Sequence, residues 1–432
     1  MSDIWRKPML KGTIAVASDK SITHRAIMFS SLAQGQSIIS NPLMGDDNIS
    51  TCKAFQAMGV DVQLVHNAII INSPGVDGLR EAEDVLDFGN SGTTTRLMLG
   101  ILSGLPLFSV ITGDQYLRKR PMMRVIDPLR QMGARIDGRD GGRLLPASVR
   151  GGDLQGITYH SPVASAQVKS ALVLAGIFAR GTTVVSEPEI SRDHTERMLP
   201  FYGVGVKVEG KTVSVTGGQR FEPRNMEVPG DISSAAFFLV AASVVPGSQV
   251  TLSNVGINPT RTGVLDILQQ MGADIRLENQ RLVCGEPVCD IVITHAPLEA
   301  AHIFGEMVPR LIDEIPALAV AMCFARGKSI VKDAKELRVK ETDRIVTTLA
   351  NLKALGVEVE EYEDGFAVTG NPDFQLPSGV TLDSYGDHRI GMSAYLFSLL
   401  QRNIIVDGME CVSVSFPNFQ KFLAQLQRGG DQ

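Results

Sequence analysis

The amino-acid sequence predicts an α/β protein of two globular domains, each made from three copies of one supersecondary unit. Three observations favour this fold class. The chain has 432 residues, of which 44% are hydrophobic and 20% charged, so it can fill more than one core. A pattern of helix, glycine and two short strands recurs along the chain. A second kind of helix, apolar on every face, accompanies this pattern.

The recurring pattern is an amphipathic helix that a glycine ends, followed by two strands of alternating polarity, as in "AFQAMGVDVQLVHNAIIINS". Glycine suits a helix end that needs positive φ, and a period of two suits a half-buried strand. The intervals between the glycines run from 69 residues (203 to 272) to 84 residues (272 to 356), as expected of a duplicated unit. These glycines are Gly59, Gly133, Gly203, Gly272 and Gly356.

The fourth and sixth copies carry more specific expectations. In the fourth, both strands are expected within "ADIRLENQRLVCG", and the "GEPV" between Cys284 and Cys289 is expected to form a hairpin. In the sixth, the helix "FPNFQKFLAQLQ" has no hairpin after it. The N-terminal segment "LKGTIAVA" is expected to supply the missing strand to this sixth unit. The first and last segments would then share a domain, and the chain would cross between domains twice.

The apolar helices begin in segments rich in capping residues, such as "DFGNSGTTTR", "VASAQVKS", "VPGDISSAAFF", "RLIDEIPALA" and "SYGDHRIGMSA". Helix N-termini offer free N–H groups and a partial positive charge, so they can hold anions. Several such termini aimed at one point would form a cleft for phosphate or carboxylate groups. The alternative is that each is an ordinary N-cap.

Basic residues stand beside many of these helix starts, although the net charge is −6. An acidic protein lacks the general electrostatic footprint of a nucleic-acid-binding protein. A local concentration of cations therefore predicts a small substrate with several negative charges. No segment matches a phosphate-binding loop or a dinucleotide fingerprint, so no nucleotide cofactor is expected. The cations are Lys20, Arg25, Arg96, Lys119, Arg120, Arg124, Lys169, Arg192, Arg197, Lys340, Arg344 and Arg389.

Targeting and redox signals favour a cytoplasmic protein. The first residues, "MSDIWRKPMLKGTIAV", have no long apolar stretch, and the longest apolar stretches elsewhere are too short to span a bilayer. Five cysteines, an odd number, are typical of a reducing compartment. No second Cys/His pair follows Cys284 and Cys289 at zinc-binding spacing, so no metal site is expected.

The segment "LRVKETDRI" is the densest charged run, and it has two interpretations. It is either a solvated helix face or a place where charge holds a reaction. Lys340 and Arg344 are four residues apart, so they are expected on one face of a helix. Arg338 and Asp343 are expected to be structural partners.

Read in order, eleven segments resemble the 5-enolpyruvylshikimate-3-phosphate (EPSP) synthase family over nearly the whole chain. They are "SDKSITHR", "GNSGTTTR", "LRKRPM", "SAQVKSAL", "RDHTE", "GDISSAAFF", "NPTRTG", "DEIPALA", "LRVKETDR", "GDHRIGM" and "SFPNF". The resemblance implies an inside-out α/β barrel in which each domain holds three βαβαββ repeats. An upper domain at 21–228 and a lower domain at 1–20 plus 229–432 are expected, with the active site in the cleft between them.

The resemblance also implies a reaction. The 5-hydroxyl of shikimate 3-phosphate attacks phosphoenolpyruvate, and the tetrahedral intermediate loses phosphate to leave an enolpyruvyl ether. This transferase step is the sixth of the shikimate pathway to chorismate and the aromatic amino acids, and the family is the target of glyphosate. No metal or organic cofactor, nucleic acid or membrane is implied as a partner. The protein is expected to be a cytoplasmic monomer.

Residue roles follow from the same resemblance. The catalytic residues are expected to be Asp313 at the 5-hydroxyl, with Glu341 and Lys20 moving protons at the methylene carbon. Shikimate 3-phosphate is expected at Lys20, Ser21, Arg25, Ser165, Ala166, Gln167, Arg192, Asp313 and Lys340. Phosphoenolpyruvate is expected at Lys20, Asn90, Gly92, Arg120, Gln167, Arg344 and Arg389. His24 and His388 are expected to be hydrogen-bonded scaffold.

Several positions depart from the best-known pattern of the family. Ser18 replaces a glycine and is expected to stiffen its turn. Ala166 stands where many members have a second serine, so one hydroxyl contact is expected to be missing. Val414 stands where many members have a lysine at phosphoenolpyruvate. The motifs match the branch called class II, often less sensitive to glyphosate, yet Gly92 keeps the space beside the pocket, so sensitivity stays open.

Two alternatives remain. UDP-N-acetylglucosamine enolpyruvyl transferase has the same fold and donor, but it typically uses a loop cysteine, and the corresponding loop "GDQYLRKRPMMRV" has none. The second alternative is a decayed paralogue that binds anionic metabolites without turnover. Such a protein is expected to lose its acid/base residues, whereas Lys20, Asp313 and Glu341 are all present.

Overall fold

The computed structural model describes residues 9–430, and the chain forms two compact units. Unit 1 comprises the N-terminal segment up to Ala17, Gly230–Arg281 and the chain from Pro287 onward. Unit 2 comprises Ser18–Pro229 and Leu282–Glu286. Each unit has its own hydrophobic core. Leu282–Glu286, which the sequence placed with the lower domain, therefore belongs with unit 2.

Unit 2 contains three four-stranded sheets with the same pairing pattern. Each has one parallel pair followed by two antiparallel pairs, in the orders β13-β2-β4-β3, β5-β6-β8-β7 and β9-β10-β12-β11. The strands are β2 (Gln34–Ser40), β3 (Asp61–Val65), β4 (Ala68–Pro74), β5 (Leu86–Asp87), β6 (Phe108–Thr112), β7 (Arg135–Arg139), β8 (Leu144–Arg150), β9 (Thr158–His160), β10 (Thr182–Ser186), β11 (Val206–Glu209), β12 (Thr212–Thr216) and β13 (Met226–Glu227).

Unit 1 repeats this pattern twice and then shortens it. Its sheets have the orders β1-β14-β16-β15 and β17-β19-β21-β20, with β18 also beside β19, and the third sheet is the parallel pair β22-β23. The strands are β1 (Lys11–Ile14), β14 (Gln249–Gly256), β15 (Asp274–Val283), β16 (Glu286–Thr294), β17 (Leu298–Glu299), β18 (His302–Ile303), β19 (Ala325–Val331), β20 (Glu358–Tyr362), β21 (Gly365–Gly370), β22 (Thr381–Asp383) and β23 (Ile405–Asp407).

Two kinds of helix alternate with the strands, as the sequence predicts. The central, mostly buried helices are α1 (Lys20–Leu32), α3 (Gly92–Gly104) and α5 (Ala166–Phe178) in unit 2, and α7 (Ile232–Val244), α10 (Ile315–Cys323) and α12 (His388–Ser398) in unit 1. The remaining helices are α2 (Asp46–Ala57), α4 (Met123–Gln131), α6 (His194–Met198), α8 (Gly263–Gln270), α9 (Met307–Leu311), α11 (Arg344–Ala354) and α13 (Phe419–Gly430). Within residues 9–430, no helix is both long and apolar enough to cross a bilayer.

The five repeated glycines follow their helices with positive φ, which confirms the predicted helix ends. Their φ angles are 94°, 103°, 81°, 97° and 80° in chain order. A residue with a Cβ atom is strained in this left-handed region, so glycine lets the chain turn directly from helix into strand. The same local chemistry therefore builds five copies of one turn.

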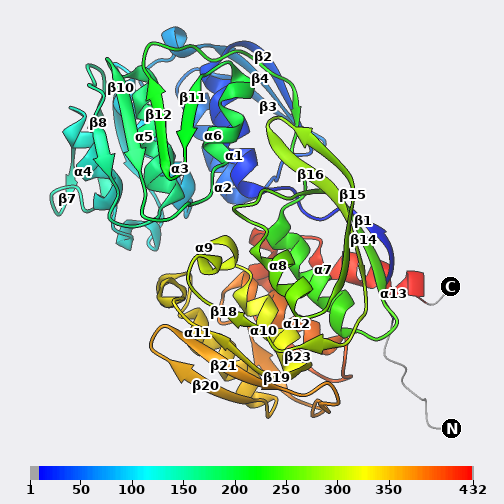
Figure 1. Ribbon diagram of the computed structural model, residues 1–432. Helices are drawn as coiled ribbons and strands as arrows, with labels where there is room; N and C mark the ends of the chain where they lie inside the picture. The colour runs from blue at the N-terminus through cyan, green and yellow to red at the C-terminus, as the bar shows by residue number, and fades with distance from the viewer. Residues whose placement is uncertain (1–8, 431–432) are drawn as a thin grey trace. The chain divides into compact units, whose positions relative to one another are not determined.

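The first strand does not join the sixth unit, so that expectation is wrong. β1 pairs in parallel with β14, in the sheet of the fourth copy. β13, which precedes α7 of unit 1, pairs instead with β2 of unit 2. Each pairing stays within one unit, β1 with β14 in unit 1 and β13 with β2 in unit 2. The first and last segments nevertheless meet, because α13 packs beside β1 (Figure 1), where Gly429 lies against the carbonyl oxygen of Lys11.

The fourth copy also differs from its prediction. "DIRLENQRLV" is one ten-residue strand, β15, and the turn to β16 comes later, at Cys284 and Gly285. These two residues have φ of 53° and 84°, as a two-residue hairpin turn with two positive φ angles requires. Asn279 also has a positive φ of 53°, but the strand continues through it. The predicted hairpin exists, but its turn precedes most of "GEPV".

We expect substitution of Gly100 by alanine to destabilise unit 2. Gly100 lies where α3 packs on α5, side by side in Figure 1, and a Cβ atom there would lie 2.2 Å from the carbonyl oxygen of Ala171. Helix propensity alone favours alanine by about 1 kcal/mol. Overpacking against a neighbouring backbone costs about 1–3 kcal/mol or more, so it should dominate. Urea denaturation should show a lower midpoint for Gly100→Ala, and a higher midpoint would contradict this packing argument.

Candidate active site

Side-chain caps mark four of the five predicted helix starts. Ser91, Ser165, Asp231 and Asp387 each accept a hydrogen bond from a backbone N–H in the first turn of α3, α5, α7 and α12. At α10 the capping position is held by Glu314, which makes no such bond. Four of the predicted helix starts are therefore capped by a side chain, as the sequence indicates.

In unit 2, cations gather at the start of α3. A Cβ atom on Gly92 would lie 2.9 Å from a guanidinium nitrogen of Arg96 and 3.0 Å from one of Arg120. Arg96 also donates to Oε1 of Gln167 over 2.9 Å. We call this group, together with Lys20 and Asp47, the α3 cluster. A side chain at position 92 would crowd both guanidinium groups, so glycine lets them lie this close to the start of α3.

The electrostatics of the α3 cluster favour an anion. Burial, and then the positive charges of Arg120 and Arg124, lower the pKa of Arg96 to about 10. Lys20 forms an ion pair with Asp47, at 3.0 Å. Burial acts to raise the pKa of Asp47, but Lys20 and other nearby cations outweigh it and lower that pKa. A negatively charged ligand would relieve the repulsion among these cations.

Arg25, on α1, is held by neutral partners. Its nitrogens donate to the Oγ1 of Thr195 over 2.7 Å, the Oγ of Ser170 over 3.0 Å and the carbonyl oxygen of Ser21 over 3.0 Å. Burial chiefly lowers its pKa; the carboxylates of Glu196, Asp19 and Glu286 oppose this change, and the charge of Arg192 adds to it. Of the predicted site residues, Ser21 thus contacts Arg25 directly, and Arg192 acts on it through its charge.

The remaining predicted residues of unit 2 lie at helix starts. Ser165 caps α5, and Ala166 is its first residue, where the methyl group offers no hydrogen bond. Asn90 is exposed and directly precedes Ser91, the cap of α3. Ser18 is buried and lies next to Asp19, which caps α1.

In unit 1, three carboxylates surround one buried arginine. Arg344, 1% exposed, contacts Asp387 at 2.8 Å, Asp313 at 3.2 Å and Glu341 at 2.6 Å. Lys340 lies 3.5 Å from Asp313. We call these five residues the Arg344 cluster. Its formal charge is −1, from three carboxylates and two cations.

Arg389 borders the Arg344 cluster. Its guanidinium donates to the carbonyl oxygen of Asp313 over 3.0 Å and lies 3.6 Å from the carboxylate of Glu314. Asp313, Lys340, Glu341, Arg344 and Arg389, the predicted site residues of unit 1, are thus brought together.

The charged run "LRVKETDRI" is not one helix, so the prediction of a shared helix face is wrong. A 3₁₀ turn, η4 (Lys335–Val339), ends before Lys340, and α11 begins only at Arg344. Asp343 breaks the run because its side chain caps α11. Lys340 and Arg344 meet through Asp313 instead of along a helix. The expected structural pair is confirmed, since Arg338 contacts Asp343 at 2.8 Å.

Glu341 is held in its charged form. Partial burial acts to raise its pKa, but Arg344, His388 and a backbone hydrogen bond together outweigh this and lower the pKa to about 2. Its side chain is still 43% exposed, the most open of the three carboxylates on Arg344. Glu341 can therefore accept a proton, and it can meet a ligand from solvent.

The two histidines near these clusters are neutral. Burial lowers the pKa of His24 to about 3, and its Nδ1 is hydrogen-bonded to the Oγ1 of Thr51 at 2.8 Å, which agrees with a scaffold role. Burial, followed by the charge of Arg389, lowers the pKa of His388 to about 4. The expected hydrogen-bonded role of His388 stays a prediction.

Sequence reasoning missed the acidic partners. Asp47 and Asp387 hold Lys20 and Arg344, and neither was a predicted site residue. Asp387 lies in "GDHRIGM", so its motif was available as a signal, whereas Asp47 in "MGDDNIS" has no comparable signal. The side chain of Val414 is outside what the structure describes, so the expectation about its missing lysine stays open.

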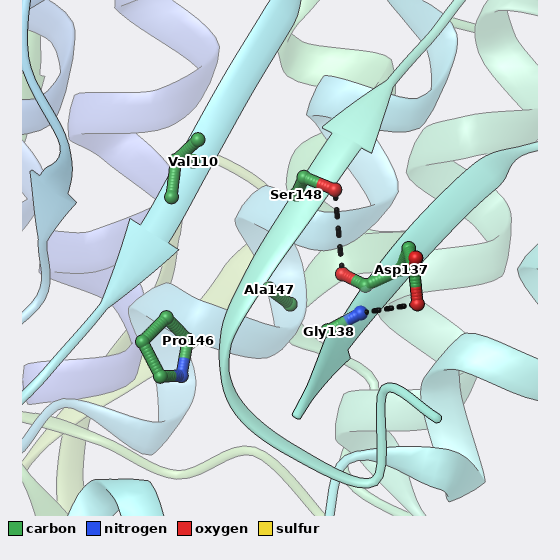
Figure 2. A pocket seen from close by; sticks show the side chains of 6 residues that line it. All are labelled: Val110, Asp137, Gly138, Pro146, Ala147 and Ser148. Carbon is green, nitrogen blue, oxygen red and sulfur yellow. Dashed lines mark hydrogen bonds between the residues drawn. The ribbon is translucent and has the colours of Figure 1, made fainter. Parts of the chain in front are cut away.

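A hollow of about 280 Å³ over β6, β7 and β8 is a separate feature (Figure 2). Asp137 is its only carboxylate among the residues drawn, and it accepts a hydrogen bond from the N–H of Gly138 over 2.7 Å. None of the described residues that line the hollow is a cation, so it does not suit an anion. The lining residues are Val110, Asp137, Gly138, Pro146, Ala147 and Ser148.

Few of the described residues could bind a metal ion or act as a reactive thiol. Among residues 9–430, no group of three or more His, Cys, Asp or Glu side chains is arranged to hold a metal ion. All five cysteines fall in this part of the chain, and each is a free thiol. Burial raises the pKa of Cys52 and Cys289 to about 12, so these two do not supply reactive thiolates at neutral pH.

The repeated α/β units and the two clusters, in which cations lie beside carboxylates, are typical of an enzyme for anionic small molecules. Comparison with known proteins gives the family. The chain belongs to the EPSP synthase (3-phosphoshikimate 1-carboxyvinyltransferase) family, whose model matches residues 6–423.

Individual relatives agree over nearly full length. The chain is 51% identical to 3-phosphoshikimate 1-carboxyvinyltransferase of Bacillus cytotoxicus, over 99% of this chain and 100% of the relative. It is 53% identical to that of Pelotomaculum thermopropionicum, over 96% of both. A solved structure of EPSP synthase from Acinetobacter baumannii matches with a TM-score of 0.91 and 44% identity, over 97% of this chain and 96% of that one. The predicted two-domain inside-out α/β fold is confirmed by this match.

The ion pair of Glu341 predicts a pH-dependent stability. A carboxylate whose pKa falls from its ordinary 4.5 to about 2 on folding stabilises the fold above pH 4.5, and this stabilisation is lost as the pH falls through about 2. Glu341→Gln lacks this contribution. Urea denaturation of both proteins, from about pH 6 down to about pH 3, should therefore show a difference in free energy of unfolding that narrows with acid. A constant or widening difference would refute the argument.

Proposed function

We propose that the protein transfers the enolpyruvyl group of phosphoenolpyruvate to the 5-hydroxyl of shikimate 3-phosphate and releases phosphate. This is the sixth step of the shikimate pathway toward chorismate and the aromatic amino acids. Family membership over residues 6–423 supports it, as does the shared activity in the names of the relatives. The observation that carries the proposal is the pair of clusters, which place cations for two anionic substrates beside carboxylates able to move protons.

Shikimate 3-phosphate is proposed to be held by cations, helix N–H groups and a carboxylate. Arg25 and Arg192, whose charges interact, would neutralise a phosphate group, with the N-terminus of α5 as a further source of N–H donors. Asp313, beside Lys340, would accept the proton of the 5-hydroxyl. The full proposed set is Lys20, Ser21, Arg25, Ser165, Ala166, Gln167, Arg192, Asp313 and Lys340.

The phosphoenolpyruvate site is proposed at Lys20, Asn90, Gly92, Arg120, Gln167, Arg344 and Arg389. The two guanidinium groups close to Gly92 and the repulsion among cations in the α3 cluster support this assignment for unit 2. In unit 1, Arg344 already holds three carboxylates, so a ligand carboxylate must displace one of them. Glu341 is the most exposed of the three and is therefore the partner that would be displaced.

This displacement supplies a route for proton transfer. While Glu341 contacts Arg344, its pKa of about 2 lets it accept a proton only weakly. Once phosphoenolpyruvate takes its place on Arg344, Glu341 loses the charge that most lowers its pKa, and the pKa rises toward the working pH. Glu341, with Lys20, would then pass protons to and from the methylene carbon as the intermediate forms and collapses.

The alternatives find less support. A decayed paralogue is expected to lose its acid/base residues, yet Asp313, Glu341 and Lys20 each stand in a network of charged partners. A UDP-N-acetylglucosamine enolpyruvyl transferase would need its loop cysteine, and the loop from Gly113 to Val125 contains none. We further propose that the protein acts as a cytoplasmic monomer. The five free thiols support a reducing compartment such as the cytoplasm.

The first experiment measures phosphate release by the purified protein with both substrates. Release should require shikimate 3-phosphate together with phosphoenolpyruvate, and EDTA should leave it unchanged, because the proposed reaction uses only this chain's own residues. Titration with glyphosate then measures sensitivity. Binding of shikimate 3-phosphate without phosphate release would favour the decayed paralogue.

Glu341→Gln tests the proposed proton carrier. The amide cannot accept or return a proton, so turnover should fall by roughly 10²–10⁴-fold while binding of shikimate 3-phosphate stays close to wild type. Glu361→Gln is the matched control, because Glu361 is a partly exposed carboxylate that pairs with Arg338 of the same charged run, at 3.0 Å. Steady-state kinetics and calorimetry measure the two effects. Turnover at the wild-type level in Glu341→Gln would remove this residue from the catalytic set.

A further inference from the structure

A second buried charge cluster lies in unit 2, and the proposed reaction gives it no role. Lys169, on α5, contacts Glu187 at 2.9 Å and Glu196 at 2.8 Å. The three side chains are 4%, 2% and 4% exposed. Burial acts to lower the pKa of Lys169, but the two carboxylates outweigh it and raise that pKa. Burying three charged groups is costly, so simple stability is a weak reason for the arrangement.

The two carboxylates differ in what else they contact. Glu187 accepts a hydrogen bond from the backbone N–H of Ser165 over 2.7 Å, and the Oγ of Ser191 lies 2.9 Å and 2.7 Å from its two oxygens. Glu196 has one buried oxygen, Oε2, without a hydrogen-bond partner among the described residues. Glu187 is therefore fully engaged, whereas Glu196 mainly balances the charge of Lys169.

The contacts of Glu187 join two segments that are separate in the sequence. Ser165 is the N-cap of α5, and Ser191 directly precedes Arg192 in the loop before α6. Lys169 adds to this connection, because its Nζ donates to the carbonyl oxygen of Ser191 over 3.3 Å. One carboxylate thus fixes the start of α5 relative to the loop that carries Arg192.

We propose that Glu187 is a positioning residue for shikimate 3-phosphate, holding the N-terminus of α5 and the Arg192 loop in the arrangement that binds the substrate's phosphate group. The inference rests on the proposed function and extends it to a residue that does not touch the substrate. Substrate affinity then depends on a group behind the binding surface.

The chemistry of the site requires a carboxylate. Lys169 approaches Oε2 of Glu187, and the N–H of Ser165 approaches Oε1, so both oxygens face hydrogen-bond donors. A glutamine side chain has one oxygen and one NH₂ group. In either orientation its NH₂ would face a donor, and one of the two segments would lose its anchor.

The test compares Glu187→Gln with the wild-type enzyme. The KM for shikimate 3-phosphate should rise roughly tenfold or more, as expected when a buried hydrogen bond to a charged group is lost, while the KM for phosphoenolpyruvate and the kcat stay within about threefold. Calorimetry should show the same loss of affinity for shikimate 3-phosphate alone. An unchanged KM for shikimate 3-phosphate, or an equal rise for both substrates, would overturn the proposal.

Glu196→Gln is the matched control. It removes the other carboxylate from the same buried lysine but leaves the bonds to Ser165 and Ser191 intact, so its KM for shikimate 3-phosphate should stay near wild type. The same rise in both variants would mean that loss of buried charge, and not positioning, is the cause. That result would also overturn the proposal.

A second variant covers the case in which Glu187→Gln does not fold. Glu187→Asp keeps the charge beside Lys169 but is one methylene shorter, so it cannot keep all the contacts to both segments. It should fold and also raise the KM for shikimate 3-phosphate, and a wild-type KM would count against positioning. If the wild-type protein shows no transfer, the proposed function fails separately, and calorimetry with shikimate 3-phosphate still tests the role of Glu187.

Discussion

Burial of the central helices on nearly every face is the constraint on which the rest of the structure depends. In α7 every residue except Ser234 is buried, in α10 every residue is buried, and α5 is nearly as enclosed. A helix surrounded on all sides by sheets and other helices can present only its ends to a ligand. Polar chemistry is therefore confined to the helix starts, where unpaired N–H groups and capping side chains are available. Most of the predicted site residues of unit 2 lie at or beside such starts.

Charge is balanced differently in the two units. The Arg344 cluster surrounds a buried guanidinium with three carboxylates, so it is nearly neutral without a ligand, and a second anion must compete for Arg344. The α3 cluster has more cations than carboxylates, and the charges of Arg120 and Arg124 add to burial in lowering the pKa of Arg96. The α3 cluster is thus net positive, whereas the Arg344 cluster is net negative.

Local features of the fold were predictable from the sequence, whereas long-range pairing was not. Helix-ending glycines and alternating strands carry their own signals, because positive φ and a period of two are properties of a few adjacent residues. The residues of β1 carry no local signal that shows whether this strand pairs with β14 or with a strand of the sixth unit. Asn279 carried a turn signal within β15, but the pairing of the long strand overrode it.

The candidate site shows the same division. Motifs located its cations and the catalytic candidates, because those residues stand in recognisable segments. The supporting carboxylates were missed, since Asp47, Glu187 and Asp387 act on residues 27, 18 and 43 positions away in the chain. Spacing within the sequence also misplaced Lys340, because the cap of α11 at Asp343 ends any continuous helix through the run.

The pairing of β1 with β14 also has a consequence for synthesis on the ribosome. The N–H of Leu10, beside β1, is bonded to Ser248 across 238 residues. At a typical elongation rate of about 5–20 residues per second, β1 leaves the ribosome roughly 10–50 s before its partner. Nearly all of unit 2 is synthesised during that time, so it can fold before β1 has a strand to pair with. Unit 1 can close only when both ends of the chain exist, which makes it the last part of the molecule to be completed.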